Sequence, residues 1–151
     1  QLLKDAFYFA TVISYAQGLA MLTKASHQLN MEIPLPEVVS VWRGGCIIRS
    51  ALLENFKIAY ENAELKNLLL DKNIAAILKQ KENSIQKIVS IAALNNLPLA
   101  GFMSSLNYYN AYRRNLLPTN LIQAQRDFFG AHTYQRIDEE GIVHSNWETN
   151  A

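Results

Sequence analysis

Apolar residues recur every three or four positions over the first part of the chain, from residue 2 to about residue 29. This spacing predicts a helix that is buried over much of its surface. At a rise of about 1.5 Å per residue, the helix would be roughly 40 Å long. Asn30, Pro34 and Pro36 follow it, and they predict its end.

The same helical spacing returns in shorter segments, which glycine, asparagine and proline residues separate. These segments predict helices over residues 36–42, 47–60, 62–70, 74–81, 84–94, 99–114 and 120–130. No alternation of apolar and polar residues persists long enough to predict a strand, and no internal repeat is visible. We therefore predict a single all-α, multi-helix unit with a long first helix.

Residues 138–151 differ from the rest of the chain, because they are polar, carry Gly141 and show no clear period. A segment of this kind buries little apolar surface by itself. We therefore assign residues 1–137 to an all-α domain and residues 138–151 to an irregular C-terminal tail. We expect the tail to order on a partner.

Composition limits the classes of function. The 151 residues are 50% apolar and 18% charged, which is enough for one core and predicts one domain. The formal net charge is +1 and Lys and Arg are scattered, so we expect no nucleic-acid partner. Cys46 is the only cysteine, which excludes an internal disulfide and favours a reducing compartment, so we expect a cytoplasmic protein.

Several other features are missing from the sequence. No apolar run approaches the roughly 18 residues of a membrane span, and the first residues lack the layout of a signal peptide, so we expect no membrane association. The chain begins without Met, which is typical of a fragment or a processed chain. The three histidines are scattered, so we expect no metal. No glycine-rich turn follows a strand, so we expect no dinucleotide fingerprint in this chain.

An arginine and a histidine flank a glycine-broken helix end in the segment NLIQAQRDFFGAHTY. Asn120 is a good N-cap residue with Gln123 three positions later, which predicts a capping-box-like start. Arg126 and His132 would lie about 120° apart on an unbroken helix. If Gly130 takes the left-handed conformation, His132 can turn back towards Arg126, and the two can share an anion. The helix dipole also favours an arginine near a C-terminus, so a structural role stays open.

A second cation stands in the segment VWRGGCIIRS. Gly44 and Gly45 separate two predicted helices, and Arg49 falls in the first turn of the second. A cation there opposes the helix dipole, but it suits an anion bound over free N–H groups. Helix stability does not explain this residue, so we predict that Arg49 binds an anion.

Several long segments follow one another in the order found in one enzyme family. They are residues 13–18 (ISYAQG), 42–50, 67–71 (NLLLD), 117–134 and 144–147 (HSNW). Together they resemble the end of the all-helical C-terminal domain of 6-phosphogluconate dehydrogenase, and the resemblance runs along nearly the whole chain.

The resemblance implies an enzyme of the pentose phosphate pathway that oxidises 6-phosphogluconate at C3 with NADP, loses carbon dioxide and releases ribulose 5-phosphate. It also implies that the lysine base, the glutamate acid and the nucleotide-binding domain lie upstream of Gln1. No catalytic residue is therefore expected in this chain, which would be inactive alone. Arg49 matches an arginine that binds substrate in the family. Arg126 and His132 match a pair that reaches into the active site of the neighbouring subunit, which implies a homodimer.

Two other classes stay open on the residues alone. One is a non-catalytic helical dimerisation module, in which Arg126 and His132 are packing residues. The other is a related β-hydroxyacid dehydrogenase with another substrate, because such enzymes share helical C-terminal domains. The phosphate-directed pair weighs against that second alternative, since guanidinium groups suit a phosphate.

Overall fold

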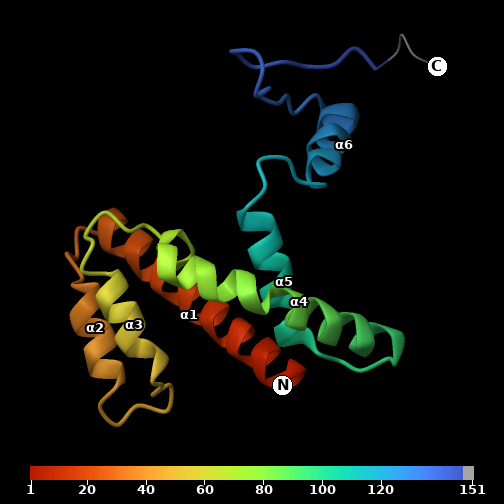
Figure 1. Ribbon diagram of the computed structural model, residues 1–151. Helices are drawn as coiled ribbons and strands as arrows, with labels where there is room; N and C mark the ends of the chain where they lie inside the picture. Colours follow the sequence, from red (N-terminus) through yellow and green to blue (C-terminus); the bar gives the residue numbers. More distant parts are fainter. Residues whose placement is uncertain (148–151) are drawn as a thin grey trace. The chain divides into compact units, whose positions relative to one another are not determined.

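The structure, a computed structural model, describes residues 1–147. Its elements, labelled in Figure 1, are α1 (Leu2–Gln28), α2 (Leu35–Trp42), α3 (Leu52–Ala59), the 3-10 helix η1 (Leu68–Leu70), α4 (Lys72–Leu94), α5 (Ala100–Tyr112) and α6 (Asn120–Gly130). The β-type pairing within residues 1–147 is one isolated bridge between Tyr134 and Val143, so the all-α prediction is confirmed. The last four residues of the predicted tail, 148–151, lie outside the described residues.

The contacts divide the chain into two compact units, Gln1–Asn110 and Ala111–Ala151. The first holds α1 to α4 and most of α5, and the second holds α6 and the segment after it. Every residue of the main hydrophobic core belongs to the first unit. The assignment of residues 1–137 to one domain stays a prediction.

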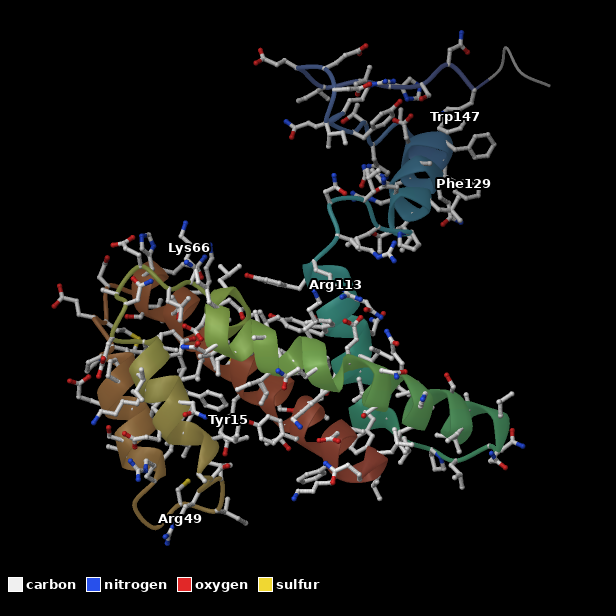
Figure 2. All side chains as sticks on the ribbon, viewed as in Figure 1. Tyr15, Arg49, Lys66, Arg113, Phe129 and Trp147 are labelled. Carbon is white, nitrogen blue, oxygen red and sulfur yellow. The ribbon has the colours of Figure 1, made fainter. Side chains whose placement is uncertain are left out.

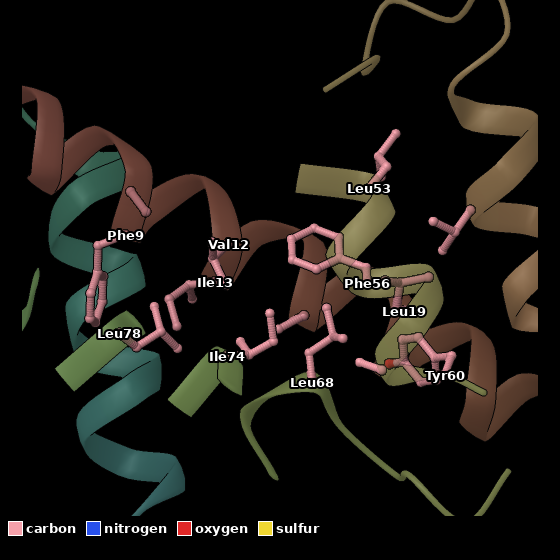
Figure 3. Close-up of a cluster of buried hydrophobic side chains, with 14 of the residues drawn as sticks. Phe9, Val12, Ile13, Leu19, Leu53, Phe56, Tyr60, Leu68, Ile74 and Leu78 are labelled. Atoms are coloured by element: carbon pink, nitrogen blue, oxygen red, sulfur yellow. The ribbon is translucent and has the colours of Figure 1, made fainter. Parts of the chain in front are cut away.

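The core of the first unit forms around α1. Phe9, Ile13 and Leu19 of this helix are fully buried. They form one cluster with Leu68 of η1 and Leu78 of α4, as Figure 3 shows. The apolar spacing of α1 therefore produces a face that packs in the core, as the sequence predicts.

By length and composition, α1 is also the one described helix that is long and apolar enough to cross a membrane. The core helix of a soluble protein meets the same criterion. In this protein α1 packs into the core through Phe9, Ile13 and Leu19. The helix stops at Gln28, and Asn30 follows with a left-handed φ of 51°, which agrees with the predicted end.

α2 and α3 lie side by side and are joined by the loop of residues 43–51 (Figure 1). α3 begins at Leu52 and not at residue 47, so the first part of that predicted helix is wrong. The glycine pair is the reason. Gly45 has a φ of 82°, and the chain then makes a tight turn in which Arg49 N donates to the Cys46 carbonyl oxygen at 3.0 Å.

The region between α3 and α4 contains less helix than the sequence predicts. Of the predicted helix over residues 62–70, only Leu68–Leu70 forms, as a 3-10 turn. The Asn67 side chain accepts a hydrogen bond from Leu69 N at 2.9 Å and so starts this turn locally. The remaining residues of the segment are turns and extended chain.

α4 is one continuous helix, so the predicted break between residues 81 and 84 is wrong. Polar residues interrupt the sequence pattern there. However, Leu78 and Ile85 are both fully buried, and they stand about two turns apart on the same face. Tertiary packing therefore continues the helix through a polar stretch.

Candidate anion-binding site

Arg49 lies in the loop between α2 and α3, where Figure 2 labels it. The predicted position in the first turn of a helix is wrong, because α3 starts only at Leu52. The helix dipole therefore does not explain this residue. Its position depends on how the loop is held.

Two contacts hold this loop. The Tyr15 hydroxyl of α1 donates to the Ile48 carbonyl oxygen, and Arg43 forms an ion pair with Glu54 across the two ends of the loop. Burial raises the pKa of the Tyr15 hydroxyl, with a smaller contribution from Cys46, so the hydroxyl keeps its proton at neutral pH. The loop that carries Arg49 is thus tied to both α1 and α3.

A hollow of about 700 Å³ opens beside the same loop. It is lined by Ser40, Arg43, Gly44, Arg49, Ser50, Ala51 and Lys57. Arg43 is paired with Glu54, whereas Arg49 and Lys57 form no ion pair with any carboxylate among residues 1–147. Two cations without a carboxylate partner, together with the Ser50 hydroxyl, which accepts from Leu52 N and keeps its own proton to donate, favour a bound anion in this hollow.

α6 carries the second predicted segment, and both of its ends differ from the prediction. The predicted cap at Asn120 is wrong: Thr119 precedes the helix, and no side chain makes a capping bond. Thr119 already has helical backbone angles, φ −61° and ψ −13°, so the extended N-cap geometry is missing. The left-handed residue is Ala131, with φ 46°, and not Gly130, which is the last residue of the helix.

His132 turns back onto the end of α6. Its ring lies so close to Gly130 that a Cβ added there would be 2.8 Å from His132 Nε2. Gln123 links the turn to Arg126: its Oε1 accepts from Arg126 Nη1 at 3.3 Å, and its Nε2 donates to the Thr133 carbonyl oxygen at 2.6 Å. Arg126 and His132 therefore belong to one hydrogen-bonded segment.

A carboxylate that sequence reasoning missed organises this segment. Asp127 is fully buried. Its Oδ1 accepts from Thr133 N at 3.0 Å and lies 2.9 Å from His144 Nδ1. Its Oδ2 accepts from Ser145 N at 2.9 Å and from Trp147 Nε1 at 3.0 Å. No spacing in the sequence marks Asp127, because three of these partners are 17 to 20 residues away.

The Asp127 carboxyl is ionised at neutral pH. Burial by itself would raise its pKa. The hydrogen bonds from His144, from the Ser145 amide and from the Trp147 indole outweigh that effect and lower the pKa to about 2. The buried carboxylate is therefore a strong acceptor that needs its donors around it.

The same bonds hold the described part of the tail against α6. Tyr134 and Val143 exchange two backbone hydrogen bonds of 2.9 Å. The Trp147 ring stands edge-on to Phe128 with 5.7 Å between centroids, and Figure 2 shows Trp147 beside α6. The sequence predicts a tail that orders on a partner. The described end of the tail bonds to its own chain through the acceptors of Asp127, and ordering on a partner stays a prediction.

The predicted site residues fall into both units. Arg126 and His132 share one segment of the second unit, whereas Arg49 faces the hollow with Lys57 in the first. Among residues 1–147, no group of three or more His, Cys, Asp or Glu side chains could hold a metal ion. The chemistry that these cations and the imidazole can provide is the binding and orientation of an anionic ligand.

The chain matches one family of known proteins. The family "6-phosphogluconate dehydrogenase, C-terminal domain" matches residues 1–147. The decarboxylating 6-phosphogluconate dehydrogenase of Lactococcus lactis subsp. lactis is 45% identical over 148 residues, which is 97% of this chain and 31% of that protein. An enzyme of Bacillus subtilis, named as NADP(+)-dependent and decarboxylating, is 44% identical over 145 residues, which is 95% of this chain and 31% of that protein.

A solved structure of the same family also matches this chain. Plasmodium falciparum 6-phosphogluconate dehydrogenase, described in apo form and with NADP+ or 6-phosphogluconate, superposes with a TM-score of 0.92 at 42% identity. The match covers 97% of this chain and 32% of that chain. This chain thus spans about a third of the length of the relatives it matches. The chain therefore belongs to the 6-phosphogluconate dehydrogenase family, whose C-terminal domain it matches along residues 1–147.

Proposed function

We propose that this chain is the C-terminal part of an NADP-dependent, decarboxylating 6-phosphogluconate dehydrogenase. The full-length enzyme oxidises 6-phosphogluconate at C3, loses carbon dioxide and releases ribulose 5-phosphate in the cytoplasm. The names of the Bacillus subtilis and Plasmodium falciparum relatives support the substrate and the nucleotide. The proposal assigns the nucleotide domain, the lysine base and the glutamate acid of the family to a part of the enzyme outside this chain, which spans 31% of such a relative. Residues 1–137 form the helical domain and residues 138–151 its tail.

The role of this chain is to bind the phosphate of the substrate through Arg49, Arg126 and His132. The observation that carries this role is that Arg49 faces a hollow in which it has no carboxylate partner from residues 1–147. A phosphate monoester carries nearly two negative charges at neutral pH, and guanidinium groups bind it through paired, charge-assisted hydrogen bonds. His132 adds a further donor to the phosphate or to a substrate hydroxyl.

A second copy of the protein is the proposed partner, and each subunit donates Arg126 and His132 to the site of the other. The surface of α6 supports an association of this kind. Its large apolar side chains are exposed, by 76% at Leu121 and 75% at Phe129. Within the described residues, the one buried residue of α6 is Asp127. Apolar exposure on this scale is typical of a surface that a partner covers.

Mixed dimers test the proposal. Subunits with Arg49→Ala and subunits with Arg126→Ala are co-expressed with different tags, and the heterodimer is purified. One of its two sites then combines an intact Arg49 with an intact copy of residues 126–132, the donated segment, from the other subunit. We therefore expect roughly half of the wild-type kcat/KM for 6-phosphogluconate per dimer. Both parent homodimers should be much less active, since every site in them lacks one cation.

The matched control combines Arg126→Ala with His132→Ala subunits. Both changes lie in the donated segment, so neither site of that heterodimer is intact and no activity should return. If the first heterodimer also fails to recover activity, the segment does not act across the interface. If neither arginine change affects turnover, the chain acts only as a helical dimerisation module.

Gly130→Ala is a second test, directed at His132. The new Cβ would lie 2.8 Å from His132 Nε2, and the ring, as the end of a side chain, is what must move. We expect the KM for 6-phosphogluconate to rise by about threefold to tenfold with little loss of stability, since alanine suits a helix better than glycine. Steady-state kinetics and the unfolding midpoint measure the two effects.

Two further variants check the cause. In a variant that already carries His132→Ala, adding Gly130→Ala should change nothing more, because both changes act through the same ring. Gly101→Ala is the control, since an added Cβ there meets nothing within 4 Å. A rise in KM that persists without the His132 ring would show that Gly130 acts by another route.

A further inference from the structure

We propose that Asp127 is a positioning residue of the donated segment, whose buried carboxylate joins the turn that carries His132 to the C-terminal tail. This inference rests on the proposed function of Arg126 and His132. It adds that the described end of the tail holds that segment in place. The tail and the residues proposed to bind the phosphate therefore form one hydrogen-bonded unit.

The first observation is the division of the bonds between the two oxygens. Oδ1 joins the turn to the tail, since it accepts from Thr133 N and contacts His144 Nδ1. Oδ2 binds the tail alone, through the Ser145 amide and the Trp147 indole. Only a side chain with two acceptor oxygens and no donor can satisfy this set.

The second observation is the backbone around His132. Ala131 and Thr133 have positive φ values of 46° and 58°, a region that residues other than glycine seldom adopt. Both backbone polar groups of Thr133 are bonded outside the turn: its amide donates to Asp127, and its carbonyl accepts from Gln123. Without the carboxylate, one of these two restraints is lost and the turn can relax to ordinary angles. His132, which stands between the two strained residues, would move with it.

The third observation is burial. Within the described residues, α6 buries one side chain completely, and that side chain is a carboxylate. An apolar residue would serve packing alone at less cost of desolvation. A buried carboxylate with four partners specifies one arrangement of the turn and the tail, which packing by itself would leave open.

The experiment replaces Asp127 with Asn in the full-length enzyme. The amide keeps the shape of the side chain but turns one acceptor into a donor, which then faces N–H groups. We expect the KM for 6-phosphogluconate to rise by about tenfold and the KM for NADP to stay within about twofold. His144→Ala removes one donor from a half-exposed position and should give the same pattern with a smaller rise.

Mixed dimers separate a positioning role from general damage to the fold. Asp127→Asn subunits should restore activity with Arg49→Ala subunits, because one site then has an intact Arg49 and receives an intact donated segment. They should not restore activity with Arg126→Ala subunits, because Asp127 and Arg126 belong to the same donated segment and neither site receives an intact copy. Restored activity with Arg126→Ala would overturn the inference, as would an unchanged KM in Asp127→Asn. If Arg126→Ala itself leaves the KM unchanged, the proposed function fails first. If Asp127→Asn does not fold, the His144→Ala dimers decide by the same two pairings.

Discussion

Replacing Arg126 with alanine in the full-length enzyme is expected to raise the KM for 6-phosphogluconate by about 10- to 100-fold. A phosphate monoester carries nearly two negative charges, and on the proposed function the change removes the charge-assisted hydrogen bonds that Arg126 makes to it. The KM for NADP should change by less than about twofold, because the proposed function assigns the nucleotide to a domain outside this chain. Steady-state kinetics with each substrate varied in turn measures both constants.

Arg136→Ala is the matched control for that result. Arg136 belongs to the same unit and forms an exposed ion pair with Asp138. An exposed pair of this kind contributes little to stability, and the residue lies outside the proposed phosphate ligands. Its loss should leave both KM values unchanged. Equal rises in the two constants for Arg126→Ala, or no rise in either, would contradict the proposed role.

The largest expected effect on stability comes from Phe9→Ala. Phe9 is fully buried, and its ring stands edge-on to Tyr109 with 5.0 Å between centroids. Removing a buried aromatic ring loses its burial and leaves a cavity, so we expect the free energy of unfolding to fall by about 3–5 kcal/mol. Denaturant unfolding, followed by circular dichroism of the helices, measures the change.

Phe7→Ala provides the matched control on the same helix. Phe7 is 63% exposed, two residues before Phe9. The same change of side chain there should cost less than about 1 kcal/mol, since most of the ring is already in water. Similar losses for the two variants would mean that the helical face assigned to the core is wrong.

Much of the fold could be predicted, and the two main errors have opposite causes. The long first helix and its end at Asn30 follow from local spacing, and the structure agrees. The predicted break in α4 fails because polar residues between Leu78 and Ile85 look like a boundary, while both flanking residues pack in the same core. The helix predicted over residues 62–70 fails for the converse reason, since apolar spacing there meets a local side-chain bond at Asn67.

The candidate site, too, could be predicted only in part. Sequence reasoning identified Arg49, Arg126 and His132 by residue type and by resemblance, and their part in substrate binding stays a prediction. It misplaced the backbone around them, because Arg49 lies in a loop and Ala131 makes the turn expected of Gly130. It missed Asp127 entirely, since a single aspartate beside two phenylalanines carries no local signal of burial.

By itself the sequence determined the helical class, the long first helix and the family of this protein. These properties depend on residue spacing and on segments of a few residues, which are local. Only the tertiary structure decided how the loop with Arg49 is tied to Tyr15 and Glu54, and how one buried carboxylate joins a helix, a turn and a tail. Those arrangements are made by hydrogen bonds and burial between residues far apart in the chain, and such contacts leave no period in the sequence.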